Sequence, residues 1–125
     1  KLSAFGTAAE AQTNWTAIRD VHAFAKQRGD VWRISVKPSD AAALTAKLGA
    51  TAVQYDWGGG LIWAMTDSGR DLRAAIGPFD GHATLIRGTA DLPTFQPEAP
   101  ALAAITNGIR AKFDPRGILN PGIMS

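Results

Sequence analysis

Two arginines, Arg33 and Arg87, are the residues of this sequence best suited to binding a ligand. Arg33 lies in the alternating stretch "VWRISVK" at 31–37, and Arg87 ends the stretch "HATLIR" at 82–87. A guanidinium group can bind a carboxylate through two parallel hydrogen bonds. If the two stretches are neighbouring strands, both arginines can stand on the sheet face that no helix covers and hold a carboxylate or a partner's acidic surface. The alternative is that both are solvated or salt-bridged.

Metal binding and acid–base catalysis have few candidate residues. His22 and His82 are the two histidines, and the chain has no cysteine. A three-ligand zinc site would therefore need carboxylates of suitable geometry. Asp56 and Asp80 have no neighbour in the sequence that would tune either of them as an acid or a base. We expect no catalytic residue and no metal ligand here, and structural or surface roles for both histidines.

Length and composition predict one globular domain. The chain has 125 residues, of which 46% are hydrophobic and 19% are charged, which is enough to bury a core. Its net charge of +2 comes from scattered residues, so a nucleic-acid partner is not expected. No apolar run is long enough to suggest a membrane span. The lack of cysteine is consistent with a cytoplasmic protein.

The elements that must position the arginines follow from the spacing of apolar residues. Alternation with period two predicts strands, and it assigns Trp32, Trp57 and Trp63 to the core. The three glycines at 58–60 permit a hairpin turn between two of the strands. Helical spacing and capping residues predict helices between the other strands. The predicted strands are 31–37, 51–57, 61–66 and 82–87; one helix follows Ser39 or Asp40 and ends at Gly49, and another follows Asp67 or Ser68 and ends at Gly77.

In chain order these elements give a strand, a helix, two strands, a helix and a strand. This is the ferredoxin-like βαββαβ pattern of an antiparallel α+β sheet, with the first and third strands in the centre. An extra N-terminal helix is expected from Thr13 to about Gln27, after an unpatterned segment at 1–12. A C-terminal helix is expected to stop near Phe113, because Asp114 precedes a proline, and an extended tail follows. Its apolar stripe is Leu102, Ile105, Ile109 and Phe113.

The closing string "FDPRGILNPG" at 113–122 resembles the C-terminal signature of FAD-linked oxidases of the vanillyl-alcohol oxidase type. Three further stretches, "WRISVKPSD" at 32–40, "YDWGGGLIW" at 55–63 and "GHATLIRG" at 81–88, look most like the smaller, FAD-binding (GlcE-type) subunit of bacterial glycolate oxidase. The resemblance covers the chain from about residue 13 onward. The motif with two histidines that related large subunits carry is not present, because "DGHATL" keeps a single histidine.

The resemblance implies that residues 13–125 form a C-terminal cap domain that covers FAD. In such enzymes a separate N-terminal domain binds the flavin, and nothing in this sequence matches that domain. The chain alone is therefore expected to be inactive and to retain no FAD. The implied partners are that N-terminal FAD-binding domain, other glycolate oxidase subunits and a small 2-hydroxyacid substrate. The implied location is cytoplasmic, with peripheral membrane association through the complex as an option.

Asn120 is the cofactor-binding residue that the resemblance implies. In this family the closing turn runs back toward the flavin domain. A side-chain amide both donates and accepts hydrogen bonds, which suits the edge of an isoalloxazine ring. Arg33 and Arg87 become candidates for the substrate carboxylate. The alternative for Asn120 is a purely local role, since asparagine is common before Pro-Gly in tight turns.

A different class of function also fits the pattern. The chain could be a stand-alone ferredoxin-like module that binds a small molecule or assembles through its sheet, without enzymatic activity. A complete reading frame of this length would favour that module, whereas a frame that extends into a flavin-binding domain would exclude it. If partner surfaces are missing, exposed apolar residues should make the chain self-associate.

Overall fold

The computed structural model describes residues 14–88 and 91–122. The expected unpatterned segment at 1–12 and the expected start of the N-terminal helix at Thr13 lie outside these ranges. The strands are β1 (Asp30–Val36), β2 (Ala52–Asp56), β3 (Leu61–Thr66) and β4 (Gly81–Arg87); the helices are α1 (Trp15–Arg19), α2 (His22–Ala25), α3 (Ala41–Leu48), α4 (Leu72–Ile76) and α5 (Pro100–Phe113).

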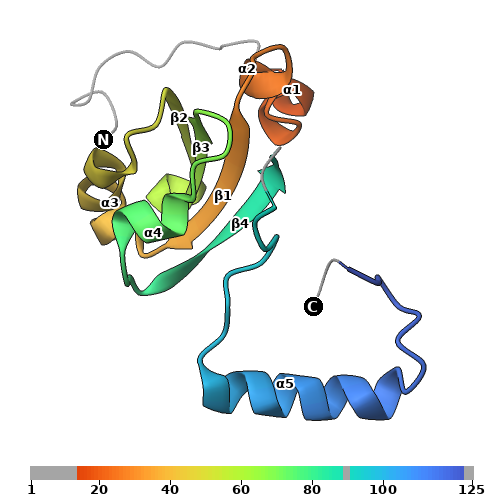
Figure 1. The fold of residues 1–125 in the computed structure, drawn as a ribbon. Coiled ribbons are helices and arrows are strands. Elements are labelled where there is room, and N and C mark those ends of the chain that lie inside the picture. The colour runs from red at the N-terminus through yellow and green to blue at the C-terminus, as the bar shows by residue number, and fades with distance from the viewer. Residues whose placement is uncertain (1–13, 89–90, 123–125) are drawn as a thin grey trace, which may run out of the picture.

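The four strands form one antiparallel sheet in the order β2-β3-β1-β4 (Figure 1). The first and third strands occupy the centre, as predicted. The order and the antiparallel pairing confirm an α+β fold compatible with a ferredoxin-like arrangement. Central strands of such a sheet are buried most deeply, and β3 accordingly has apolar residues on both faces.

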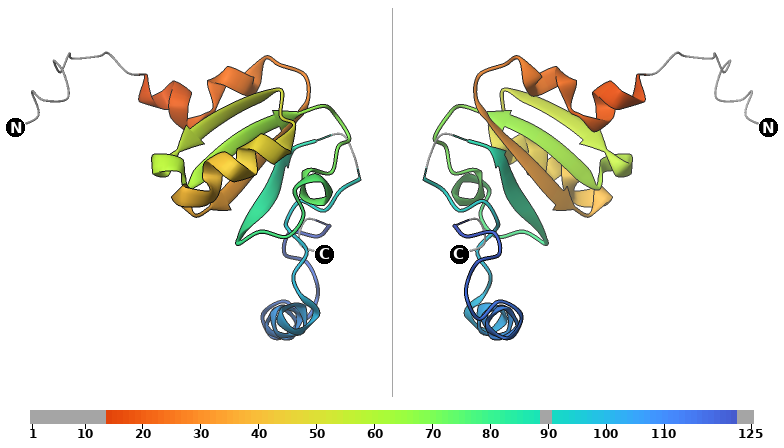
Figure 2. Two further views of the ribbon diagram at one scale, coloured as in Figure 1. Left: turned by 90° about the vertical axis from the view of Figure 1, so that its left-hand side faces the viewer. Right: turned by 90° about the vertical axis from the view of Figure 1, so that its right-hand side faces the viewer.

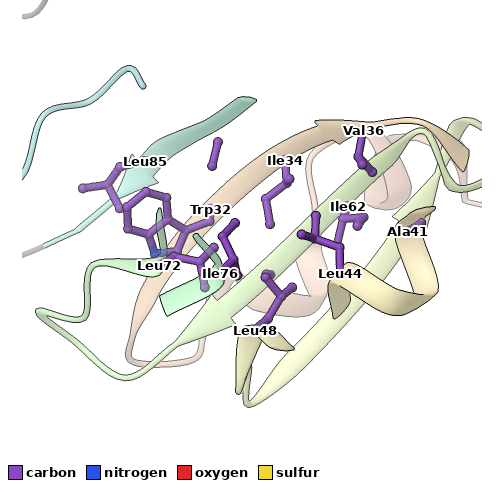
Figure 3. Close-up of a cluster of buried hydrophobic side chains, with 12 residues drawn as sticks. Trp32, Ile34, Val36, Ala41, Leu44, Leu48, Ile62, Leu72, Ile76 and Leu85 are labelled. Carbon is purple, nitrogen blue, oxygen red and sulfur yellow. The ribbon is translucent and has the colours of Figure 1, made fainter. Parts of the chain in front are cut away.

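The main core lies between the sheet and the helices α3 and α4 (Figure 3). Trp32 and Ile34 of β1, Ile62 of β3, Leu48 of α3 and Leu72 of α4 are all fully buried. Each such side chain contributes about 1.5–3 kcal/mol through burial. The alternation of β1 therefore aims its apolar side at this core, and Arg33 lies on the other side.

The two core helices have clear end signals. α3 begins after Asp40 and ends where Gly49 adopts a left-handed conformation with φ of 54°, which glycine permits without steric cost. For α4, the predicted caps Asp67 and Ser68 are wrong. Asp71 is the cap, and its side chain accepts a hydrogen bond from the backbone N–H of Arg73.

The predicted long N-terminal helix is instead two short helices. Asn14 caps α1 by accepting from Ala17 N–H, but the chain turns sharply at Val21, whose φ is 50°. This conformation is unfavourable for a β-branched residue. The turn lets Val21 and Phe24 pack against Val31 on the sheet face opposite α3 and α4, where Figure 2 shows α1 and α2.

Trp57, which strand alternation assigned to the core, is exposed instead. It begins a 3₁₀ turn, Trp57–Gly59, that connects β2 to β3, so the predicted hairpin is confirmed but Trp57 has left the strand. Its side chain is 62% exposed, whereas Trp32 is fully buried. The alternation ends with the last strand residue, Asp56.

The helix α5 stands apart from the sheet and its covering helices (Figures 1 and 2). It spans Pro100–Phe113, has a proline in its first turn, and ends at Phe113 as predicted, with Asp114 as its C-cap. Among the described residues, it contains no buried side chain.

Of the helices in the ranges 14–88 and 91–122, none has the length and apolar character needed to cross a lipid bilayer.

Candidate functional site

The sheet face opposite α3 and α4, here called the open face, carries both arginines. Arg33 lies opposite Thr84 of β4, and Arg87 lies opposite Val31 of β1. Val31 and Arg33 point to the same side because they are two residues apart in one strand. An irregularity in the pairing beside Val31 places Arg87 on this side, since simple alternation after Leu85 would have turned Arg87 toward the core.

Arg87 is bound to backbone carbonyls. Its guanidinium donates to the carbonyl oxygens of Phe24, Gln27 and Gly29 at 3.2, 2.9 and 3.3 Å. The Phe24 carbonyl also accepts from the backbone N–H of Gln27, so Arg87 adds a charged donor at the end of α2. Arg87 therefore joins the end of β4 to the turn that follows α2.

Arg33 has a different partner. Its guanidinium lies 5.3 Å from the ring centroid of Trp57, which is within range of a cation–π interaction. In the described ranges no hydrogen bond involves the Arg33 guanidinium, so its N–H groups are available to a carboxylate. The two arginines thus share a face, but their guanidinium groups contact different parts of the chain.

A shallow groove of about 250 Å³ lies between the N-terminal helices and the open face, and Phe24, Val31, Trp63 and Ile86 form its apolar lining. Arg19 and Arg87 also line it. A second groove of about 360 Å³ adjoins it at Arg19. The volume of the first groove is slightly below that of most small-molecule pockets.

The histidines lie apart from each other in the fold. His22 is the first residue of α2 and His82 is in β4 opposite Ser35, and both are exposed. Within the described part of the chain, no three histidine, aspartate or glutamate residues gather closely enough to hold a metal ion.

The second candidate surface is the C-terminal arm, defined as α5 and the loop 114–122. The predicted stripe on α5 is present but unburied: Leu102 is 52% exposed, Ile105 61%, Ile109 54% and Phe113 83%. Helix stripes of this spacing normally face a core. Large contiguous apolar patches on a surface commonly mark sites of interaction with another protein.

The loop of the arm is held in shape by Asp114. Its carboxylate accepts hydrogen bonds from the backbone N–H groups of Ile118 at 3.0 Å and Leu119 at 2.8 Å. These N–H groups lower the pKa of Asp114 below its ordinary value. Ile118 and Leu119 do not anchor the loop by burial, since both are 63% exposed.

Asn120 projects from this ordered loop. Its backbone is in the left-handed region with φ of 47°, which asparagine tolerates better than most residues. The residue is exposed, and in the described part of the chain its amide has no hydrogen-bond partner. In Figure 1 the arm, which carries Asn120, lies apart from the sheet, which carries both arginines.

Sequence reasoning missed two residues near these surfaces. Trp57 partners Arg33 because the 3₁₀ turn exposes its ring. Arg73 of α4 donates to two carbonyls of the connector between β4 and α5. The glycine triplet after Trp57 was the sequence feature that could have indicated a turn at Trp57 and an exposed ring. The second contact joins positions about twenty residues apart, and no local pattern indicates it.

Comparisons of the chain with known protein families, with curated proteins and with solved structures find no match. Function must therefore be inferred from the motifs and surfaces of the chain itself.

Proposed function

We propose that this chain is the cap part of an FAD-dependent oxidoreductase that acts on a small 2-hydroxyacid, with glycolate as the expected substrate. The structure of the C-terminal arm is the observation that carries the proposal. It combines an exposed apolar stripe on α5 with the ordered loop of the string "FDPRGILNPG", which resembles a flavoprotein signature. Both features suit a surface that another domain completes.

The stripe supplies the energy for docking on that domain. Burying four large apolar side chains such as Leu102, Ile105, Ile109 and Phe113 would contribute about 1.5–3 kcal/mol each, before the cost of association. The described residues of this chain do not cover them. A flavin-binding domain on the same polypeptide or in a partner subunit is the proposed cover.

The loop holds the residue that carries the proposed flavin contact, Asn120, in a defined position. Because Asp114 already fixes Ile118 and Leu119, little conformational freedom is lost when Asn120 meets a ligand, and preorganisation of this kind raises affinity. The carboxamide of Asn120 can donate to one atom and accept from another. We assign it to the edge of the isoalloxazine ring or to the loop that holds the ring.

The glycine triplet of this chain does not have the form of a site for the diphosphate of FAD. The glycines at 58–60 belong to the turn between β2 and β3, whereas a phosphate-binding glycine loop opens a helix. The flavin would supply the redox chemistry. This chain would orient the ring through Asn120 and attract the substrate carboxylate through Arg33 of the open face.

The test uses the assembled enzyme that contains this chain and its FAD-binding domain. The flavin absorbance and glycolate-dependent reduction of a dye are measured for wild type, Asn120→Ala and the control Asn107→Ala on α5. We expect Asn120→Ala to weaken FAD retention by about tenfold, the equivalent of one hydrogen bond to a polar group, and Asn107→Ala to change nothing. Isolated chain that is yellow and releases FAD on denaturation would contradict the proposal.

The substrate site has its own test in the same enzyme. Arg33→Met should raise KM for glycolate with little change in kcat, because it removes binding shared by the ground and transition states. The sequence alone also predicts a raised KM for Arg87→Ala. The three carbonyl contacts of Arg87 make Arg33 the stronger candidate. An unchanged KM in both variants would exclude the arginines from substrate binding.

The second candidate function is a stand-alone module that binds a small molecule, and the groove beside Ile86 and Arg87 favours it. Small carboxylic acids added to the isolated chain would then shift the NMR signals of Ile86, Trp63 and Phe24. Binding there by the isolated chain, without any flavin domain, would favour this module over the cap domain.

A further inference from the structure

The connector between β4 and α5 lies along the outer edge of β4. Leu85 N–H donates to the carbonyl oxygen of Thr94 at 2.8 Å, and Ala83 N–H donates to the side-chain oxygen of Gln96 at 2.8 Å. Leu92, near the start of the connector, packs against the main core. The connector is therefore attached over the five residues from 92 to 96 to the body, defined as the sheet and the helices α1 to α4. After Gln96 the chain departs toward α5 (Figure 1).

Arg73 of α4 fastens the same stretch from the core side. Its guanidinium donates to the carbonyl oxygens of Pro93 at 2.6 Å and Phe95 at 2.7 Å. The group also lies 4.9 Å from the ring centroid of Trp32, which is fully buried. Only 10% of the Arg73 side chain is exposed. A planar guanidinium held between a buried ring and two carbonyls has little freedom to reorient.

The contacts of Arg73 with the carbonyls of Pro93 and Phe95 are here called the clamp. The path from the clamp to α5 is short and stiff. Three residues, 97–99, separate Gln96 from Pro100, the first residue of α5. Pro97 has a fixed φ, and both Gln96 and Ala99 precede prolines, which restricts them to extended conformations. Glu98 also accepts a hydrogen bond from Thr106 of α5 at 3.1 Å. A rotation of the connector at Pro93–Gln96 would therefore be passed on to the whole arm.

We infer that Arg73 is the positioning residue that sets the direction in which the C-terminal arm leaves the body. It acts through the backbone of residues 93–95, and it touches neither α5 nor the loop. That Arg73 thereby places Asn120 for the flavin rests on the proposed function. The mechanical inference itself concerns the chain alone and needs no flavin.

A contribution to stability alone would be a different role, and the two are separable. If Arg73 only stabilises the body, its removal lowers the unfolding midpoint but leaves the arm in one direction. If Arg73 sets the direction, its removal gives the arm many directions while the sheet stays folded. The distance from the body to α5 distinguishes these outcomes, and the unfolding midpoint does not.

The chain has no cysteine, so two spin labels can be placed without background. Lys47→Cys on α3 with Ala104→Cys on α5 reports the direction of the arm, and Lys47→Cys with His82→Cys on β4 reports the integrity of the body. All three positions are exposed. In double electron–electron resonance, Arg73→Met should broaden the distance distribution of the first pair by at least about twofold, as expected for a connector freed from its support. The second pair should remain narrow.

Arg70→Met is the matched control, because Arg70 of the preceding turn also donates to a backbone carbonyl, that of Gly49 at 2.9 Å, but does not contact the connector. It should leave both distributions narrow. A narrow, wild-type distribution for the arm pair in Arg73→Met would overturn the inference. If Arg73→Met does not fold, Arg73→Lys keeps the positive charge but loses the planar fork that binds both carbonyls, and an unbroadened arm pair in that variant would count equally against the inference.

The outcome is independent of the flavin test. A broadened arm in Arg73→Met, together with an Asn120→Ala enzyme that retains FAD normally, would support the clamp and refute the proposed role of Asn120. A narrow arm in Arg73→Met, together with an FAD-deficient Asn120→Ala enzyme, would refute the clamp and support the role of Asn120.

Discussion

The body and the C-terminal arm contain the same kinds of apolar residue at regular spacing, yet only the body buries them. Ile34 of β1 is 0% exposed and Ile109 of α5 is 54% exposed. The stripe on α5 is as regular as the buried stripe of α3, which consists of Ala41, Leu44 and Leu48. Periodicity therefore predicts which side of an element will be covered, but it does not tell whether the cover belongs to the same chain.

The arm also differs in what holds it together. An isolated helix of fourteen residues is marginal in water, and α5 receives no buried contact from the body. Its support is local: Pro100 at the first turn, the basic residues Arg110 and Lys112 in the last turn, which suit the negative end of the helix dipole, and Asp114 beyond. The body is stabilised by burial, and the arm by end effects.

The largest expected effect is a difference between two identical substitutions. Ile34→Ala in the body should lower the free energy of unfolding by about 2–5 kcal/mol, because it leaves a cavity in a packed core. At protein concentrations where the chain is monomeric, Ile109→Ala in the arm should change it by less than about 0.5 kcal/mol, as is usual at exposed sites. Urea denaturation followed by circular dichroism measures both.

A large loss of stability in Ile109→Ala would break the comparison. It would mean that α5 is covered in solution, by a second copy or by the body. Repeating the measurement at several protein concentrations separates these cases, because only association makes the midpoint depend on concentration.

Much of the body was predictable because its signals are local. The alternation in β1 and the glycine that ends α3 require only neighbouring residues to be read. The cap of α4 was misassigned because Asp67, Ser68 and Asp71 are all acceptable caps, and the side chain of Asp71 is the one that caps the helix. The break at Val21 has a tertiary cause, since it brings Phe24 onto the sheet.

The candidate site was harder to predict, for physical reasons. The direction of Arg87 depends on an irregularity in strand pairing, and its carbonyl partners lie about sixty residues away. The clamp by Arg73 likewise joins segments distant in sequence. For Asn120 the sequence indicated a turn, which is present. The Asp114 contacts that shape the preceding residues came only from the structure.

The next effect concerns association through the arm. We expect the isolated chain to self-associate through the stripe on α5. Ile105→Glu should weaken this association by at least about tenfold, since burying an unpaired carboxylate costs more than about 1.4 kcal/mol. Sedimentation velocity over a range of concentrations measures it. Ala104→Glu, on the opposite side of the same helix, is the control and should associate as wild type does; a chain that stays monomeric at high concentration would refute the expectation.

A smaller effect compares the two arginines of the open face. Arg87→Ala should cost about 1–2 kcal/mol, because it leaves carbonyls near the end of α2 without a charged donor. Arg33→Ala should cost about 0.5 kcal/mol, the value of an exposed cation–π contact. Hydrogen exchange should locate the first loss in α2, whose amides would exchange faster. Equal costs for the two variants would show that the carbonyl contacts of Arg87 contribute little.

The smallest effect is confined to the loop and appears as a pH dependence. The pKa of Asp114 is lowered mainly by the N–H groups of Leu119 and Ile118, and the pKa of Asp80 in the body is lowered mainly by Lys37. A carboxyl group whose folded pKa lies below its unfolded value stabilises the folded form above the unfolded pKa. This stabilisation is lost as the pH falls through the folded pKa.

The loop should therefore keep its shape at neutral pH and open only in acid below the ordinary range of aspartate. NMR titration of the Ile118 and Leu119 amides follows the opening, and Asp114→Asn should abolish the titration. High salt separates the two carboxyl groups: it screens the exposed pair of Lys37 and Asp80 and returns the pKa of Asp80 toward its ordinary value. The fixed hydrogen bonds at Asp114 are screened less, so its pKa should stay low. If the pKa of Asp114 rises with salt as much as that of Asp80, charge and not the hydrogen-bond geometry of the loop holds residues 114–119 in place.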